Sequence, residues 1–261
     1  MGFDEERARR RSTISRRPLE QMRYAIVSDI HGNLAAFEAC LSDAGDVGGL
    51  WCLGDTVGYG PCPNECVRRV RDLATHSVLG NHDAAAIDRE DLSLFSPTAR
   101  KSGLWTRRCL EDDVAAYLRS LPLRVEVGDV VLVHATPASP SKWHYLFSAT
   151  FAQFEFAAFE ERICFIGHSH VPAIYENATQ GAQPASSNGP RALRAGCRYI
   201  VNVGSVGQPR DGDPRASYGL YDDERETIEI RRVGYEIAET QRKIREACLP
   251  AALAERLAYG E

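Results

Sequence analysis

Aspartate, asparagine and histidine residues, the side chains of this sequence most suited to metal chemistry, are concentrated in five short motifs. These are Asp29-x-His31, Gly54-Asp55, Gly80-Asn81-His82-Asp83, His134 after an apolar run, and Gly167-His168-Ser169-His170. Five of the seven histidines in the 261 residues belong to these motifs, which chance placement explains poorly. Carboxylates, amide oxygens and imidazoles bind divalent cations, and the two oxygens of Asp55 can bridge two cations about 4 Å apart.

Each motif taken alone has an ordinary structural explanation. An aspartate after a strand is often a turn or cap residue, and a single histidine there is usually only a polar loop residue. Together, the five motifs predict a site for two metal ions. His82 can protonate a departing alkoxide, because the unperturbed pKa of histidine lies near neutrality. His76 and His144 are interpreted as non-ligands, and His144, beside Trp143 and Tyr145, is considered for a pocket wall.

Short apolar runs precede the motifs and predict strands that end at them. Expected strands cover residues 24–28, 50–53, 77–79, 125–127, 130–134, 163–166, 199–203, 217–221 and 227–233. Helices are expected at 34–42, at 64–73, twice between 97 and 121, and from 235 to 259 with a break at Pro250. Residues 177–198, rich in Ala, Ser, Gly, Gln and Pro, are predicted to form a long loop. In α/β folds, loops at the carboxyl ends of strands collect at one edge, where we expect the chemistry.

Composition narrows the class of protein. The chain is 44% apolar and 26% charged, which is typical of a folded protein with one large α/β domain. Its net charge of -5 argues against a general nucleic-acid binder, and no apolar run approaches the ~20 residues that span a bilayer. The scattered cysteines resemble the reduced cysteines of a cytoplasmic protein. Residues 1–21, with six arginines, are expected to be a disordered basic tail before a single domain at 22–261, and Met22 is a candidate start of translation.

The ordered motifs D-x-H, G-D-x-x-G, G-N-H-D, an apolar strand ending in His, and G-H-S-H resemble those of the calcineurin-like metallophosphoesterase family. The similarity to small bacterial and archaeal members extends to G-D-T-V-G-Y-G-P at 54–61 and N-V-G-S-V-G-Q-P-R at 202–210. The resemblance implies an α/β fold of four layers, in which two mixed β-sheets pack face to face between helices. It also implies that one metal is bound by Asp29, His31, Asp55 and His170. The other metal would share Asp55 and be bound by Asn81, His134 and His168, with His82 near the leaving group.

We therefore expect a small phosphorylated substrate and hydrolysis of a phosphate ester, with phosphodiesters favoured. Two divalent cations (Mn, Fe, Zn, Co or Ni) would lower the pKa of a bridging water to give hydroxide, and His82 would act as general acid. Phosphoprotein phosphatases of the superfamily carry Asp and Arg where this chain has Gly58 and Tyr59, so a bidentate phosphate clamp is missing there. Arg210, with Asn202 and Tyr59, is the candidate set for substrate binding.

Other functions stay open at this point. A phosphomonoesterase, a protein phosphatase or a dinucleoside polyphosphate hydrolase would use the same metals with a different substrate wall. A non-catalytic binding scaffold would usually lack a ligand or the acid histidine, and all of those positions are filled here. We expect the loops at about 58–66, 84–97, 137–150 and 204–215 to form the exposed pocket. Membrane and nucleic-acid partners are not expected, and homo-oligomerisation is left open.

Overall fold

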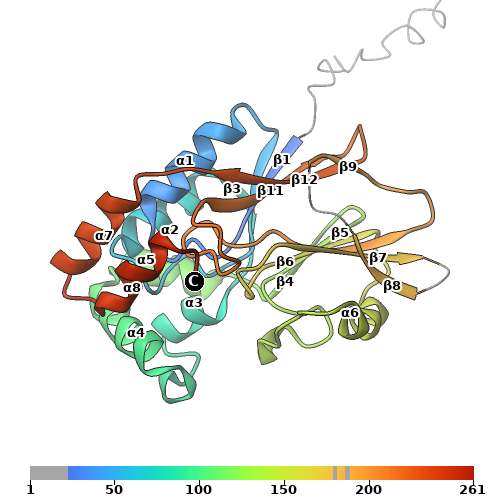
Figure 1. Cartoon of the computed structure of the whole chain (residues 1–261). Helices are drawn as coiled ribbons and strands as arrows, with labels where there is room; N and C mark the ends of the chain where they lie inside the picture. The colour runs from blue at the N-terminus through green and yellow to red at the C-terminus, as the bar shows by residue number, and fades with distance from the viewer. Residues whose placement is uncertain (1–22, 179–180, 186–188) are drawn as a thin grey trace, which may run out of the picture.

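Two six-stranded mixed sheets lie at the centre of the computed structural model, which describes residues 23–178, 181–185 and 189–261 (Figure 1). The predicted tail at 1–21 lies outside these residues. The first sheet has the order β3 (Ala74–Ser77), β2 (Gly49–Cys52), β1 (Arg23–Val27), β11 (Ala216–Asp222), β12 (Thr227–Val233), β9 (Arg191–Ala192). The second has the order β4 (Arg124–Val127), β5 (Val130–Val133), β6 (Ile163–Ile166), β10 (Arg198–Asn202), β7 (Ala173–Ala178), β8 (Gly181–Ala185).

Some helices pack on the outer faces of the two sheets, and others gather at one end of the sheets (Figure 1). The helices are α1 (Leu34–Ala44), α2 (Pro63–Leu73), α3 (Asn81–Ala86), α4 (Pro97–Cys109), α5 (Asp112–Ser120), α6 (Ala149–Glu155), α7 (Ile237–Glu246) and α8 (Ala251–Glu255). Four 3-10 turns complete the described elements: η1 (Leu92–Leu94), η2 (Pro140–Lys142), η3 (Phe156–Ala158) and η4 (Arg256–Ala258). No described helix is long and apolar enough to cross a membrane.

The hydrophobic core consists of layers that follow the alternation of side chains along the strands. Ile26 of β1 and Phe165 of β6 belong to the cluster between the two sheets. The next residue, Val27, points to the other face and packs with Phe37 of α1. Cys164, next to Phe165, belongs to a third cluster with residues of α6 and η3. The apolar runs are buried on both faces because each sheet has a helical layer on one side and the other sheet on its second side. The predicted four-layer α/β fold is confirmed.

Two local predictions are wrong. The strand predicted at 77–79 ends at Ser77 and begins at Ala74, so the following residues form the connection to α3. The segment predicted as a loop at 177–198 contains the end of β7, all of β8, and β9. Of these strands, β8 and β9 lie at sheet edges and pair through their backbones, so that Pro184 is tolerated in β8 and no alternating apolar pattern is required. Composition alone therefore gave the wrong assignment.

The C-terminal elements α7, α8 and η4 pack beside the edge of the sheets where several loops meet (Figure 1). Ile244, Leu253 and Leu257 from these elements form a cluster with Tyr59 from the loop after β2. This packing brings the last residues of the chain next to residues that lie far away in the sequence.

Candidate dinuclear metal centre

The predicted ligands lie where the two sheets meet at the carboxyl ends of their parallel strands. Asp29 and Asp55 follow β1 and β2, which pair in parallel, and His134 and His168 follow the parallel pair β5 and β6. Backbone hydrogen bonds join neighbouring loops, from Asp29 N to Gly54 O (3.0 Å) and from Gly167 N to His134 O (2.8 Å). His168 N donates to Asp29 Oδ2 (2.9 Å), which connects the loops of the two sheets.

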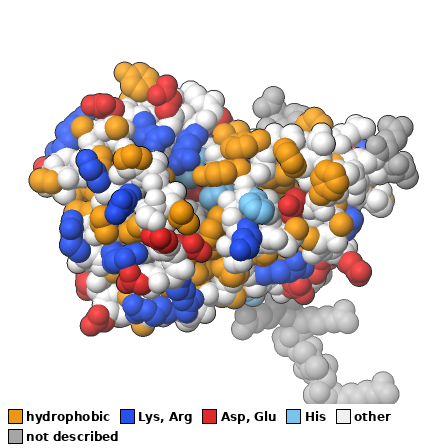
Figure 2. All heavy atoms as spheres, turned by 90° about the horizontal axis from the view of Figure 1, so that it is seen from below, with side chains coloured by type: hydrophobic (Ala, Val, Ile, Leu, Met, Phe, Trp, Pro, Cys, Tyr) orange, Lys and Arg blue, Asp and Glu red, His pale blue; other side chains and the backbone are white. Residues whose placement is uncertain are grey.

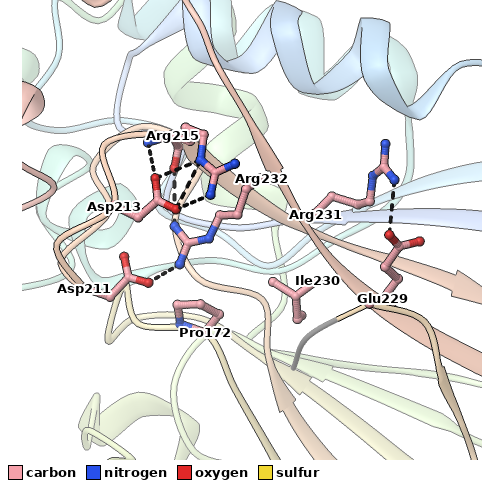
Figure 3. Close-up of a pocket in the computed structure, with 9 residues that line it drawn as sticks. Pro172, Asp211, Asp213, Arg215, Glu229, Ile230, Arg231 and Arg232 are labelled. Atoms are coloured by element: carbon pink, nitrogen blue, oxygen red, sulfur yellow. Dashed lines mark hydrogen bonds and ion pairs between the residues drawn. The ribbon is translucent and has the colours of Figure 1, made fainter. Parts of the chain in front are cut away.

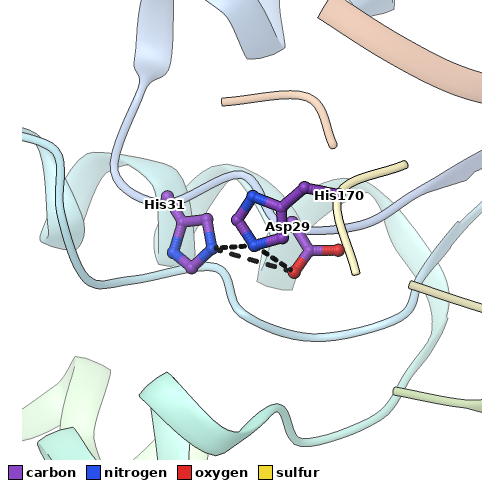
Figure 4. A group of neighbouring side chains, drawn as sticks. All are labelled: Asp29, His31 and His170. Atoms are coloured by element: carbon purple, nitrogen blue, oxygen red, sulfur yellow. Dashed lines mark hydrogen bonds and ion pairs between the residues drawn. The ribbon is translucent and has the colours of Figure 1, made fainter. Parts of the chain in front are cut away.

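Two groups of potential ligands result. The first comprises Asp29, His31 and His170 (Figure 4), and the second comprises Asp55, His134 and His168. In the first group, His170 Nε2 lies 3.1 Å from His31 Nε2 and 3.2 Å from Asp29 Oδ1. In the second, His134 Nε2 lies 3.2 Å from His168 Nδ1 and 3.1 Å from Asn81 Oδ1. All six side chains of the two groups are buried.

Asp55 lies between the two groups. Its Oδ2 is 3.3 Å from His134 Nε2 in one group and 3.8 Å from His31 Nε2 in the other. Its Oδ1 accepts a hydrogen bond from the backbone N–H of His82 (2.7 Å), which fixes the carboxylate. Asp29 is arranged in the same way, with Oδ2 bonded to His168 N. In both aspartates the second oxygen is buried without a hydrogen-bond partner, and each unpartnered oxygen faces imidazole nitrogens.

The four imidazoles are held in defined tautomers by backbone carbonyls. His31 Nδ1 lies 3.0 Å from Val57 O, His134 Nδ1 lies 2.8 Å from Leu53 O, and His170 Nδ1 lies 2.6 Å from Gln208 O. His168 uses its other nitrogen, with Nε2 placed 2.8 Å from Trp143 O. A carbonyl oxygen only accepts, so the nitrogen that faces it carries the proton. The remaining nitrogen of each neutral ring then presents a lone pair to the centre of its group.

Electrostatics favours the protonation states that bind metal at most of these residues. Burial, assisted by neighbouring imidazoles, lowers the pKa of His31 and brings that of His168 to about 3. Burial opposes ionisation of Asp29, but the charge and hydrogen bond of His170 keep the pKa of this carboxyl below its ordinary value. Burial also disfavours a charge on His134, yet the Asp55 and Asp29 carboxylates raise its pKa to about 9. Neutral imidazoles and ionised carboxylates are the forms that bind cations.

These observations fit a pair of divalent cations. The Nε2 atoms of His31 and His170 lie 3.1 Å apart, and His134 Nε2 lies 3.2 Å from His168 Nδ1. Such contacts, together with two unpartnered carboxylate oxygens, are unfavourable without a positive charge between them. Oxygen and nitrogen donors in this ratio suit Zn²⁺, Mn²⁺, Fe²⁺ and similar ions. The donor set therefore provides two potential metal positions that share Asp55.

His82 lies beside the two groups, at the start of α3. Its ring centroid is 4.9 Å from that of His31 and 4.5 Å from that of Tyr59. A Cβ atom added to Gly58 would come within 2.7 Å of His82 Nδ1, so the imidazole occupies the space that a side chain at position 58 would need. Burial lowers the pKa of His82 to about 4, against the opposing effect of Asp55. A proton on this ring therefore requires further negative charge nearby, such as that of a bound phosphate ester.

A cavity of about 420 Å³ opens above His82 and His168. Its other lining residues are Tyr59, Asn81, Glu90, Leu94, Phe95, Ser96, Ala99, Trp143, Tyr145, Arg210 and Arg256. Figure 2 shows histidine side chains in a hollow on this face, with basic and apolar side chains along its rim. Eleven of the thirteen lining residues, including Tyr59, Phe95 and Tyr145, belong to the loops from which the pocket was expected or to the predicted metal-site motifs, whereas Ala99 and Arg256 do not.

The predicted substrate-binding residues separate into two kinds. Tyr59 and Arg210 line the cavity and are joined by a hydrogen bond from Arg210 Nη2 to Tyr59 Oη (3.3 Å). Asn202 is 1% exposed and lies below the site, where its amide donates to Gly167 O (2.6 Å) and Ser169 Oγ (2.9 Å). In this structure Asn202 supports the loop that carries His168 and His170, and it does not face the cavity.

The lining of the cavity also differs from the sequence-based prediction at His144 and Arg256. His144 is exposed and is not among the lining residues, although both of its neighbours line the cavity. Arg256 was missed because an arginine near the end of a polar helical segment has the pattern of a solvated surface residue. Gln208, whose carbonyl fixes the His170 tautomer, was missed in the same way, since no spacing rule marks a residue that acts through its backbone.

Comparison with known proteins agrees with this geometry. Residues 22–226 match the calcineurin-like phosphoesterase superfamily domain. An uncharacterized protein of Methanocaldococcus jannaschii is 40% identical over 243 residues, covering 90% of this chain and 97% of its own length. A metallophosphoesterase from Sphaerobacter thermophilus has a similar crystal structure, with a TM-score of 0.84, 46% identity and coverage of 93% of this chain and 100% of that one.

A third similarity covers only part of the chain. A symmetrical bis(5'-nucleosyl)-tetraphosphatase of Aromatoleum aromaticum is 36% identical over 121 residues, which is 43% of each protein. The family match covers most of the sequence, and the two groups of His and Asp side chains lie where the matched motifs bring them together. The chain belongs to the calcineurin-like phosphoesterase superfamily and is a hydrolase that acts on phosphate esters.

Proposed function

We propose that this protein is a phosphodiesterase that depends on two divalent metal ions, with His82 as general acid. The observation that carries the proposal is the pair of ligand groups on either side of Asp55, each with an unpartnered carboxylate oxygen facing imidazole nitrogens. Asp29, His31, Asp55 and His170 would hold one cation. Asp55, Asn81, His134 and His168 would hold the other. The donor set suits Mn, Fe, Zn, Co and Ni, and the ion that is bound depends in part on which of them is available.

When bound, the two cations would lower the pKa of a water molecule and neutralise charge on the phosphoryl oxygens. The chain itself would orient the ester and manage the proton. Tyr59, 8% exposed, and Arg210 lie on one side of the cavity and can donate hydrogen bonds to non-bridging oxygens. His82 lies at the opening beside them and can give its proton to the departing oxygen. The negative charge of the ester would raise the low pKa of His82 towards the working range.

The absence of a clamp at positions 58 and 59 supports a diester substrate. A phosphate monoester carries one more negative charge than a diester and benefits more from a bidentate arginine close to the metals. Gly58 leaves room only for the His82 ring, and Tyr59 contributes a hydroxyl group in place of a guanidinium. Arg210 reaches the cavity from a different loop and is bonded to Tyr59 and to Gln208 Oε1 (3.1 Å).

A second candidate is a hydrolase of nucleotides that contain several phosphates, and the aromatic wall of the cavity favours it. The Tyr145 ring stacks on His168, with centroids 4.1 Å apart and planes at 15°. Phe147 stacks on Tyr145 in turn at 5.5 Å, and both Tyr145 and Phe147 are more than half exposed. Exposed stacked rings of this kind can bind a nucleobase. The partial similarity to a bis(5'-nucleosyl)-tetraphosphatase points in the same direction.

The decisive experiment compares bis-p-nitrophenyl phosphate with p-nitrophenyl phosphate as substrates. Protein stripped by a chelator would be refilled with Mn²⁺, and in parallel with Zn²⁺, Fe²⁺, Co²⁺ or Ni²⁺, and assayed on both. We expect metal-dependent turnover with a higher kcat/KM for the diester. A higher kcat/KM for the monoester would refute the diester assignment. No turnover of any phosphate ester by protein shown to contain two metals per chain would refute the catalytic assignment.

A matched pair of variants separates the site from the rest of the fold. Asp55→Asn removes the carboxylate placed between the two ligand groups, and we expect it to reduce both metal content and turnover. Asp129→Asn changes an aspartate in the turn between β4 and β5, away from the cavity, and should leave both unchanged.

A further inference from the structure

Arg210 and Arg256 converge at the mouth of the cavity from two different parts of the chain. Arg210 Nη2 donates to Gln208 Oε1 (3.1 Å), and Arg256 Nη1 donates to the same oxygen (3.3 Å). Two guanidinium groups therefore share one neutral acceptor, the side chain of Gln208, which is 2% exposed. The Gln208 backbone carbonyl faces His170 Nδ1, so this residue connects the arginine pair with a predicted metal ligand.

The two arginines differ from other arginines nearby in having no side-chain carboxylate partner. A second hollow contains three arginines, each ion-paired within it: Arg215 with Asp213, Arg231 with Glu229, and Arg232 with Asp211 (Figure 3). Arg231 is also ion-paired with Asp43. Within the part of the chain that the structure describes, neither Arg210 nor Arg256 forms an ion pair with an Asp or Glu side chain. Arg256 Nε donates to a main-chain oxygen of Glu261 (2.6 Å), and the charge of Glu261 partly offsets that of Arg256.

Like charges held close together in a partly buried position are unfavourable unless an anion joins them. Burial lowers the pKa of Arg256, and the charge of Arg210 lowers it further. Arg210 Nε is buried without a hydrogen-bond partner, and its guanidinium lies over the Tyr59 ring at 5.7 Å. The side chains are thus fixed in position but incompletely neutralised, which is typical of guanidinium groups that receive a phosphate.

The position of the pair relative to the metal ligands indicates which part of a substrate it would contact. Arg210 is next to Tyr59, whose ring lies 4.6 Å from the His31 ring, so Arg210 is close to the predicted metal site. Arg256 comes from η4 and lines the same cavity, where it contacts the side chain of Gln208, whereas the predicted ligand His170 contacts the Gln208 backbone. It also lies outside residues 22–226, which match the family domain, so the family motifs carry no information about it.

We propose that Arg210 and Arg256 together bind a second phosphate group of the substrate, and that the protein prefers phosphate esters that carry such a group. Nucleoside diphosphates, polyphosphates and their esters are the chemical class that this arrangement fits. The inference rests on the proposed function, because it assumes that the first phosphate is bound at the metal site. Arg256 is then a specificity-determining residue supplied by the C-terminal helices, whose packing against Tyr59 places it there.

The test compares adenosine 5'-monophosphate with adenosine 5'-diphosphate as competitors of bis-p-nitrophenyl phosphate in initial-rate assays, with Mn²⁺ in excess. Three variants are compared with the wild type: Arg256→Gln, Arg256→Lys and Arg242→Gln. Arg242 is an exposed arginine of α7, so its replacement controls for loss of a charge in the same helical segment. We expect Arg256→Gln to weaken diphosphate inhibition about 10-fold, as loss of a charge-assisted hydrogen bond does. Monophosphate inhibition should change less than about 2-fold, because a single phosphate bound at the metal site does not reach Arg256.

Arg256→Lys should recover part of the diphosphate affinity, because it restores the charge without the planar fork, and Arg242→Gln should behave as the wild type. Equal weakening of both nucleotides by Arg256→Gln, or no change in either, would overturn the proposal. Calorimetric titration gives a readout besides activity. Each nucleotide is titrated into the His82→Ala protein, in which turnover is slow, and into the same protein that also carries Arg256→Gln, and the two dissociation constants are compared. If the wild type hydrolyses no phosphate ester, the proposed function fails, while this titration still decides whether Arg256 distinguishes two phosphates from one.

Discussion

Replacing His82 with alanine tests the assignment of the general acid separately from the metal ligands. The backbone N–H of His82 donates to Asp55 Oδ1 (2.7 Å), and alanine preserves this bond. Among the described residues, no ring nitrogen of His82 makes a hydrogen bond. The ring instead packs against Tyr59 and Phe95, with centroids 4.5 and 5.1 Å apart. The substitution should therefore leave the ligands in place and the metal content nearly unchanged.

The expected loss is in turnover. A positioned general acid contributes about 10²- to 10⁴-fold, which corresponds to about 3–5 kcal/mol of the barrier. The loss should be largest for an alkyl diester, whose leaving oxygen needs a proton, and smallest for bis-p-nitrophenyl phosphate, whose leaving group departs readily without one. We would measure kcat for both esters and metal content by mass spectrometry, with His76→Ala as a control outside the site.

Two results would refute this reasoning. Loss of metal from His82→Ala to the extent seen with Asp29→Ala would show that the ring supports the ligands. An equal loss of kcat for good and poor leaving groups would show that His82 orients the ester without transferring a proton.

Three further predictions follow from the same geometry. Removal of metal by a chelator should lower the Tm, since a ligand at 1,000 times its Kd stabilises a fold by about 4 kcal/mol per site. Scanning calorimetry would measure the Tm with and without metal, and an unchanged Tm would contradict the proposed metal site. Gly58→Ala should lower kcat more than 10-fold with metal retained, because the added Cβ would lie 2.7 Å from His82 Nδ1 and the φ of this residue is +89°. Gly128→Ala is the control, because Gly128 also has a positive φ (+58°) but its Cβ would meet no atom within 4 Å. The hydrogen bond from Arg231 holds the pKa of Asp43 below its usual range. The ionised carboxylate therefore stabilises the fold at pH values above its ordinary pKa, near 4, and this stabilisation is lost as the pH falls. Asp43→Asn should therefore cost about 0.5–1 kcal/mol at pH 7, discounted for exposure, and the difference from the wild type in urea unfolding should vanish at acidic pH; a difference that persists there would contradict it.

The two groups of Asp and His side chains could be predicted to lie together because their sequence signals are local. A strand that ends in Asp or His can be recognised from an apolar run and one polar residue, and parallel strands bring such ends together. The edge strands β8 and β9 could not be predicted, since they are specified by backbone pairing with β7 and β12. Asn202 was assigned to the substrate because its motif is close to Arg210 in sequence, but its short side chain is used within the loop below the site. Arg256 depends on the packing of α7 and α8 against Tyr59, a long-range contact without a sequence pattern.

The backbone of the site shows why the ligands depend on the whole fold. Five of the predicted ligands have left-handed backbones, with φ of 53° at Asp29, 50° at His31, 52° at Asp55, 65° at His168 and 60° at His170. A residue other than glycine loses about 1 kcal/mol or more in this region, so these turns would not form in an isolated peptide. Hydrogen bonds between loops hold them, for example from His31 N to Asp55 O (2.9 Å) and from Gly207 N to Asp29 O (2.9 Å). Because hydrogen bonds between these loops, both within one sheet and between the two sheets, bear the strain, the fold itself sets the backbone geometry of the predicted ligands. A change that loosens these loops should therefore weaken metal binding at the proposed site even where it touches no predicted ligand.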